Sequence, residues 1–258
     1  MKTSITRTVK NKTMPQKTCD CSASKIICEN PGENSKNSEK KCIVCGKNCG
    51  RPTLLDLFSG AGGAAYGYRK AGFCVLGIDI NPQPRYAGCR FHQADAMTYP
   101  VEGFDVIHAS PPCQHYSFGT PNKSKHIGTL PAVREMLKKS GLPWVIENVP
   151  GAPLDTSTMI CGCQVGLPMI RRRRFFEFSF PFYALAQPCR HDGPVITVTG
   201  HGTTSGNRKT WGRNIRVSEM RDAMGIDWMN RDELSQAIPP AYTFWIGQQL
   251  LEALKCEI

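Results

Sequence analysis

Thr53-Leu-Leu-Asp-Leu-Phe58-Ser59-Gly60-Ala-Gly62-Gly63 places a short apolar run directly before a glycine-rich turn. The run is bounded by turn residues, which predicts a buried strand. Small residues follow from Ala64 to Ala71, and they predict a helix that packs close to a sheet. A strand, a tight turn and a helix in this order begin an α/β domain with a mostly parallel sheet.

Four more apolar runs continue this pattern, and each leads to a polar or reactive side chain. The runs begin at Cys74, Phe91, Phe104 and Trp144, and the side chains that they lead to are Asp79, Asp95, Cys113 and Glu147. Parallel strands end at one edge of a sheet, and open α/β sheets bind ligands at that edge. We therefore expect all four side chains to face one binding edge.

The glycine turn is also a candidate cofactor site. Gly60-x-Gly62-x-x-Ala65 fits a dinucleotide-binding turn, and Asp79 follows at the distance of a ribose-binding acid. Such glycines let the backbone approach a pyrophosphate or an amino-acid carboxylate, although a purely structural turn has the same pattern. Asp95 adds an acid that suits a hydrogen bond to an adenine amino group. The two acids favour S-adenosylmethionine over a nicotinamide dinucleotide.

Cys113 and Glu147 form the candidate catalytic pair. Two prolines stiffen the turn before Cys113, which favours a positioned nucleophile over a packing cysteine. Val145 and Ile146 draw Glu147 inward, where an unpaired carboxylate is costly. Glu147 therefore needs a partner.

Four consecutive arginines, Arg171 to Arg174, precede Phe175, Phe176 and Phe178. A run of arginines most often lies on an exposed face, but the aromatic residues after it indicate a strand with alternating faces. We expect Arg172 and Arg174 to point inward.

Eight short motifs occur in one order between Thr53 and Ile258. They are Asp56–Gly63, Gly77–Asn81, Ala94–Ala96, Pro111–Gln114, Glu147–Val149, Arg172–Phe176, Arg216–Gly225 and Ala237–Pro240. In this order they resemble the motifs of the cytosine-5 DNA methyltransferases, and the chain is most similar to the short phage-type members. Two positions depart from the family pattern, since Ile170 stands where Gln is common and Gln236 stands where Asn is usual.

The resemblance implies a Rossmann-like S-adenosylmethionine-dependent methyltransferase fold, α/β with helices on both faces of a mostly parallel sheet. It implies that the cofactor is held by Phe58, Ser59, Gly60, Gly62, Asp79 and Asp95, and that catalysis is carried by Cys113, Glu147, Arg172 and Arg174. The Cys113 thiolate would add to C6 of cytosine, so that C5 attacks the sulfonium methyl group, and Glu147 would be the general acid near N3. The arginines would orient the carboxylate and the base, and would lower the thiol pKa below its free value of about 8.5.

A net charge of +11 indicates a polyanionic partner, although a solvated basic tail is the simpler alternative. The partner that the resemblance implies is duplex DNA, from which the target cytosine must swing out of the helix. Target recognition would fall to a short segment at about residues 178–215, where Gly200–Lys209 predicts either a flexible, donor-rich contact loop or a plain surface loop. The resemblance also suggests a role in restriction-modification. A structured RNA substrate, or a catalytically silent DNA-binding or cofactor-binding protein, remains an alternative.

Residues 1–51 differ in composition from the methyltransferase-like residues 52–258 and predict a basic, cysteine-rich and weakly folded segment. Its cysteines are Cys19, Cys21, Cys28, Cys42, Cys45 and Cys49. Cys42-x2-Cys45-Gly46 resembles half of a zinc site, but no second such pair accompanies it, so zinc and free thiols both stay open and no metal ligand is assigned. Farther along, the irregular spacing of Cys161, Cys163, Cys189 and His191 favours packing over a metal.

The composition also bears on location. No run of about 20 apolar residues exists that could span a bilayer, and the first ten residues lack the apolar block of a signal peptide. An odd count of thirteen cysteines indicates reduced thiols. We expect a cytoplasmic monomer in a bacterium or a phage-infected host cell.

Overall fold

The computed structural model describes residues 41–256, apart from residues 119, 121, 185–186 and 200–204. The first 40 residues of the basic segment, with Cys19, Cys21 and Cys28, therefore lie outside the described residues. The first half of the Gly200–Lys209 stretch lies outside them as well.

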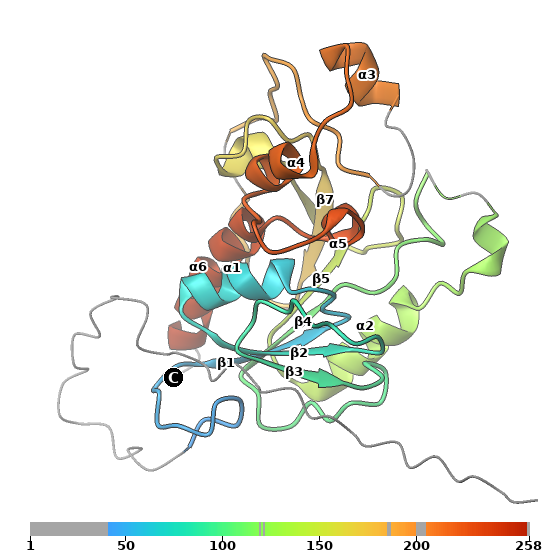
Figure 1. Ribbon diagram of the computed structural model, residues 1–258. Helices are drawn as coiled ribbons and strands as arrows, with labels where there is room; N and C mark the ends of the chain where they lie inside the picture. The colour runs from blue at the N-terminus through green and yellow to red at the C-terminus, as the bar shows by residue number, and fades with distance from the viewer. Residues whose placement is uncertain (1–40, 119, 121, 185–186, 200–204, 257–258) are drawn as a thin grey trace, which may run out of the picture.

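One seven-stranded sheet forms the centre of the protein (Figure 1), in the order β3-β2-β1-β4-β5-β7-β6. The strands are β1 (Thr53–Leu57), β2 (Cys74–Asp79), β3 (Arg90–Gln93), β4 (Val106–Ala109), β5 (Trp144–Asn148), β6 (Ser157–Ile160) and β7 (Arg174–Phe178). The first five pair in parallel, and β7 runs antiparallel to both of its neighbours. The predicted α/β class and mostly parallel sheet are confirmed.

Helices cover both faces of the sheet. They are α1 (Gly63–Ala71), α2 (Leu130–Ser140), α3 (Ser205–Trp211), α4 (Val217–Met224), α5 (Arg231–Gln236) and α6 (Pro240–Cys256), with short 3-10 helices η1 (Lys123–Lys125) and η2 (Gly162–Val165). Alternate residues of a strand face opposite sides, so Leu55 and Leu57 pack in a cluster with the apolar face of α2, whereas Leu54 packs with α1 and α6. Among the described residues no helix has both the length and the apolarity of a membrane span.

A third, smaller apolar cluster lies outside these two layers. It joins α4 and α5 to the segment around Ile196 and Val198. In Figure 1, α3 and α4 lie at the top of the view, away from β1, β2 and β3. Residues 205–209 belong to α3, so the described part of the Gly200–Lys209 stretch is helical and not the predicted loop.

Residues 41–51 lie against the domain, although the composition places them in a separate segment. Val44 is only 1% exposed and belongs to the cluster that contains Leu55 and Leu57. Its burial shows that the end of the basic segment contributes to the main core.

Glycines let α1 and α6 approach closely. A Cβ atom at Gly67 would meet the hydroxyl oxygen of Thr243 and the carbonyl oxygen of Pro240, and one at Gly63 would meet the carbonyl oxygen of Ile238. These carbonyl groups belong to the backbone and have little freedom to move. The predicted helix is confirmed, and Ala64 and Ala65 pack in one cluster with residues of the sheet, as expected. Its glycines serve contact with α6 and with the residues just before α6.

Replacing Gly67 by alanine should destabilise the protein. Alanine is favoured over glycine in a helix by about 1 kcal/mol, but the clash with α6 should outweigh this and lower the free energy of unfolding by about 1–3 kcal/mol. Urea unfolding measures the change. Gly193→Ala is the matched control, because a Cβ atom there meets nothing within 4 Å. Equal stability of the two variants would contradict the close packing of α1 on α6.

Candidate active site

The predicted cofactor residues line the carboxyl ends of three adjacent strands. Phe58, Ser59 and Gly60 follow β1, Asp79 is the last residue of β2, and Asp95 comes two residues after β3. Since β3, β2 and β1 are parallel neighbours, these ends lie side by side. Gly62 precedes the first residue of α1.

The turn after β1 depends on unusual backbone angles and on Asp79. Gly60 and Gly62 have φ values of 49° and 81°, and Phe58, which is not a glycine, has a φ of 59°. The two carboxylate oxygens of Asp79 accept hydrogen bonds from the amides of Gly60 and Asn81, both at 2.9 Å. Asp79 therefore fixes the turn, and each of its oxygens keeps a lone pair for a further donor.

The turn is accessible at its outer face. A Cβ atom at Gly60 would meet nothing within 4 Å, Phe58 and Ser59 are only half-buried, and Asp95 is exposed. The residues present therefore fit a ligand that lies against the turn and reaches both acids.

Asp56, one residue before the end of β1, is an unusual buried group. Its side chain is fully buried, and neither carboxyl oxygen has a hydrogen-bond partner among the described residues. Burial raises the pKa of Asp56 well above its usual range, and the charge of Asp79 adds to this effect. The sequence shows Asp56 only as part of a motif, because no local sequence pattern predicts how deeply a side chain is buried behind a turn.

Cys113 lies on a turn that its neighbours hold in place. The amide of Ser110 donates to the carbonyl of Leu57 at 3.1 Å, and the side-chain amide of Asn148 donates to the carbonyl of Pro111 at 3.1 Å. The turn is thus tied to both strands that flank β4. Asn148 is fully buried, and its positioning role was not predicted from the sequence.

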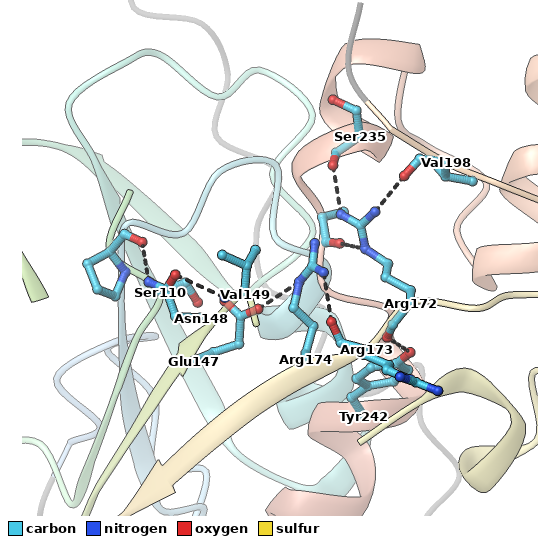
Figure 2. Close-up of polar contacts among 12 residues, drawn as sticks. Ser110, Glu147, Asn148, Val149, Arg172, Arg173, Arg174, Val198, Ser235 and Tyr242 are labelled. Carbon is cyan, nitrogen blue, oxygen red and sulfur yellow. Dashed lines mark hydrogen bonds and ion pairs between the residues drawn. The ribbon is translucent and has the colours of Figure 1, made fainter. Parts of the chain in front are cut away.

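Glu147 forms a buried ion pair with Arg174 (Figure 2). Arg174 Nε lies 2.8 Å from Glu147 Oε1, and the two side chains are only 13% and 8% exposed. Burial raises the pKa of the Glu147 carboxyl, although Arg174 and Arg172 act to lower it. The expectations that Glu147 points inward and that it has a partner are both met.

Arg172 is also inward and buried, but it does not contact the Glu147 carboxylate. Its guanidinium donates to three backbone carbonyl oxygens, those of Ala237 at 3.0 Å, Val198 at 2.7 Å and Ser235 at 2.7 Å (Figure 2). Burial lowers the pKa of Arg172 to about 9, and Arg174 adds to this effect. Of the two arginines expected to orient the carboxylate, Arg174 pairs with it, whereas Arg172 ties the start of β7 to the α5–α6 junction.

The pKa of the Cys113 thiol differs from the expectation. Burial raises the pKa of Cys113, the charge of Glu147 raises it further, and Arg174 and Arg172 oppose both effects without outweighing them. The predicted lowering is therefore not found in the free protein. Cys113, Glu147 and Arg174 share one electrostatic environment, so a change in the charge of one group shifts the others.

No family model and no curated protein matches the chain, but solved structures do. A structure described as a DNA modification methyltransferase encoded within an E. coli prophage aligns with a TM-score of 0.53 at 15% identity, over 79% of this chain and 99% of its own. The S. pombe Dnmt2 methyltransferase aligns with a TM-score of 0.54 at 15% identity, over the same shares of the two chains. The Entamoeba histolytica methyltransferase EhMeth aligns with a TM-score of 0.50 at 13% identity, over 80% and 98%. The chain therefore has the Rossmann-like methyltransferase fold.

Replacing Arg174 by methionine should cost stability in a pH-dependent way. The variant leaves the Glu147 carboxylate buried without its counter-charge, which should lower the free energy of unfolding by about 3–5 kcal/mol at pH 8. Loss of Arg174 also raises the folded-state pKa of Glu147 further, so the carboxyl becomes neutral and the loss shrinks as the pH falls. Urea unfolding between pH 5 and pH 8 tests this. The double variant Glu147→Gln/Arg174→Met should regain most of the stability, and a loss independent of pH would refute the role of the pair.

Proposed function

We propose that this protein is a methyltransferase that uses S-adenosylmethionine to methylate C5 of cytosine in duplex DNA. The observation that carries the proposal is the meeting of Cys113, Glu147 and Arg174 at the same sheet edge as the glycine turn. A thiol, a buried carboxyl and a cation in one environment suit addition of the thiol to an electron-poor ring.

The residues that would hold the cofactor lie on the three strand ends described above. The turn from Phe58 to Gly62 would face its amino-acid end, Asp79 the ribose hydroxyls and Asp95 the adenine amino group. Once bound, the cofactor supplies an electrophilic methyl group on a sulfonium. Asp79 suits this role because its carboxylate is already held by two amides.

Cys113 would attack C6 of cytosine as a thiolate, which makes C5 nucleophilic. After C5 has taken the methyl group, a base would remove the C5 proton and the bond between Cys113 and C6 would break, which restores the ring and frees the thiolate. In the free protein the thiol is held protonated by burial and by the negative charge of Glu147. Protonation of Glu147, which its raised pKa favours, removes that negative charge and so lowers the pKa of Cys113. The same proton lets Glu147 donate a hydrogen bond near N3 and neutralise the charge that enters the ring.

Arg174 and Asn148 would keep these groups in place. Arg174 holds Glu147 through an ion pair at one carboxyl oxygen, which receives no hydrogen bond from the described residues, and the other oxygen would reach the base. Asn148 holds the Pro111 carbonyl, and through it the turn that carries Cys113. Arg172 would act as a positioning residue, through its contacts with the backbone around α5 and α6.

Duplex DNA is the proposed substrate because C5 and C6 of a stacked cytosine are out of reach until the base is flipped into the site. The net charge of +11 favours a phosphate-rich partner. Residues 178–215 would supply contacts to the DNA, and α3 carries Arg208 and Lys209 on this segment. We place the enzyme in the cytoplasm as a monomer.

Cys113→Ser should abolish methyl transfer while leaving cofactor binding by calorimetry unchanged. Glu147→Gln should lower the transfer rate by about 10²–10⁴-fold, the usual contribution of a general acid, while the protein stays folded.

DNA with fluorine at C5 of the target cytosine should trap a denaturation-resistant adduct with the wild type, because no proton can leave C5. Normal turnover of Cys113→Ser, or an adduct that forms without Cys113, would refute the mechanism.

The substrate is tested by incubating the purified protein with a tritiated methyl donor and either duplex DNA or folded RNA. Label in 5-methylcytosine of the DNA is expected. Label only in RNA would support the same chemistry on a different nucleic acid, and no label on either would favour a silent binding protein. Bisulfite sequencing of DNA from expressing cells then reads the modified sequence.

A further inference from the structure

Four potential metal ligands from two separate stretches of chain meet beside the candidate active site. They are Cys161, Cys163, Cys189 and His191, and their ligand atoms all lie within 4.8 Å of one another. Cys161 Sγ lies 3.3 Å from His191 Nε2, and Cys163 Sγ lies 3.6 Å from Cys189 Sγ. All three cysteines are free, so no disulfide explains the cluster.

These distances match the edges of a tetrahedral zinc site. With Zn–S bonds of about 2.3 Å and a Zn–N bond of about 2.0–2.1 Å, neighbouring ligand atoms lie about 3.5–3.8 Å apart. The separations of Cys161 Sγ from His191 Nε2 and of Cys163 Sγ from Cys189 Sγ fall within about 0.2 Å of that range. Three thiols and one imidazole are also a common ligand set of structural zinc.

Surrounding groups orient the ligands as expected around a metal. His191 Nδ1 faces the carbonyl oxygen of Pro168 at 3.4 Å, which leaves Nε2 free to bind. Gln164 accepts from the Cys161 amide at 2.9 Å and donates to the carbonyl of Gln187 at 2.8 Å. A single side chain thus bridges the two segments that carry the cysteines.

Arg173 contacts Cys189 and places a positive charge beside the cluster. Arg173 is exposed, and it would balance the net negative charge of one zinc ion with three thiolates.

We propose that Cys161, Cys163, Cys189 and His191 bind a structural zinc ion. The ion would fasten residues 187–191 to the chain after β6, next to the arginines that lead into β7. This segment needs such a fastening, because the described residues between β7 and α3 contain no helix and no strand beyond a single bridge from Ile196 to Ile170. The inference does not depend on the proposed reaction.

A second cluster carries the same conclusion independently. Cys42, Cys45, Cys49 and Cys74 place four thiols within 4.8 Å of one another. The first two form a tight knuckle, in which the Gly46 amide donates to the Cys42 carbonyl at 2.8 Å and Gly46 has a φ of 68°. The sequence lacks a second Cys-x2-Cys pair, but the fold supplies the fourth thiol from the first residue of β2. The geometry points to a second zinc ion that fastens residues 41–51 to the sheet.

Zinc content of the full-length protein tests both sites. After passage over a chelating resin, elemental mass spectrometry should find about two zinc ions per chain. Cys163→Ser/Cys189→Ser should keep one ion, and Cys45→Ser/Cys49→Ser should also keep one. Cys113→Ser is the matched control, since Cys113 belongs to neither group of four, and it should keep two. Cys89 contacts Cys74, so Cys89→Ser tests which of these two thiols is the ligand, and it should also keep two.

The wild type gives a second readout in case a variant fails to fold. A mercurial that titrates thiols should release zinc in two steps, and cobalt exchanged into the protein should show thiolate-to-metal absorption. A wild type without bound zinc would overturn both sites. Loss of zinc from Cys89→Ser would overturn the assignment of Cys74, and iron in place of zinc would overturn the choice of metal.

Discussion

The reversed direction of β7 is the constraint on which the candidate site depends. The first five strands run in parallel, so their reactive residues gather where the strands end. Because β7 runs the opposite way beside β5, its first residue reaches the same edge, and Arg174 meets Glu147 there. A parallel β7 would place this arginine at the opposite edge, and the buried carboxylate would lack its cation.

Burial then sets the chemical character of the site. It favours the neutral form of both Glu147 and Cys113, while Arg174 pulls each toward its anion. Two acids in one low-dielectric environment do not ionise independently, so the charge of one controls the other. A site built in this way favours the protonated thiol until a bound group changes the balance.

Much of the fold and site was predictable from local sequence. The strands β1, β2, β3 and β5 begin within one residue of the predicted runs, because short apolar runs between turn residues have few other interpretations. Asp79, Glu147 and Cys113 were predictable because they lie at or just after the carboxyl end of a predicted strand. The role of Arg172 was not predictable, since its three partners lie between 26 and 65 residues away in the chain.

The thiol pKa and the metal clusters could not be predicted for the same reason, since both depend on residues that are far apart in the chain. The pKa of Cys113 depends on the balance of burial and three charges, and no spacing encodes that balance. Cys74 joins Cys42, Cys45 and Cys49 only through the packing of residues 41–51 on β2. Irregular spacing argued against a metal at Cys161, Cys163, Cys189 and His191, yet the fold gathers these four side chains.

The glycine contact between α1 and α6 has a consequence for the order of events during synthesis. About 170 residues separate Ala71 from Pro240, and a ribosome that adds about 5–20 residues per second needs roughly 8–34 s to make them. Throughout that interval the face of α1 that later receives α6 has no partner. A nascent chain paused in this region therefore exposes apolar surface, and chaperones that recognise such surface have their longest opportunity before the final helix emerges.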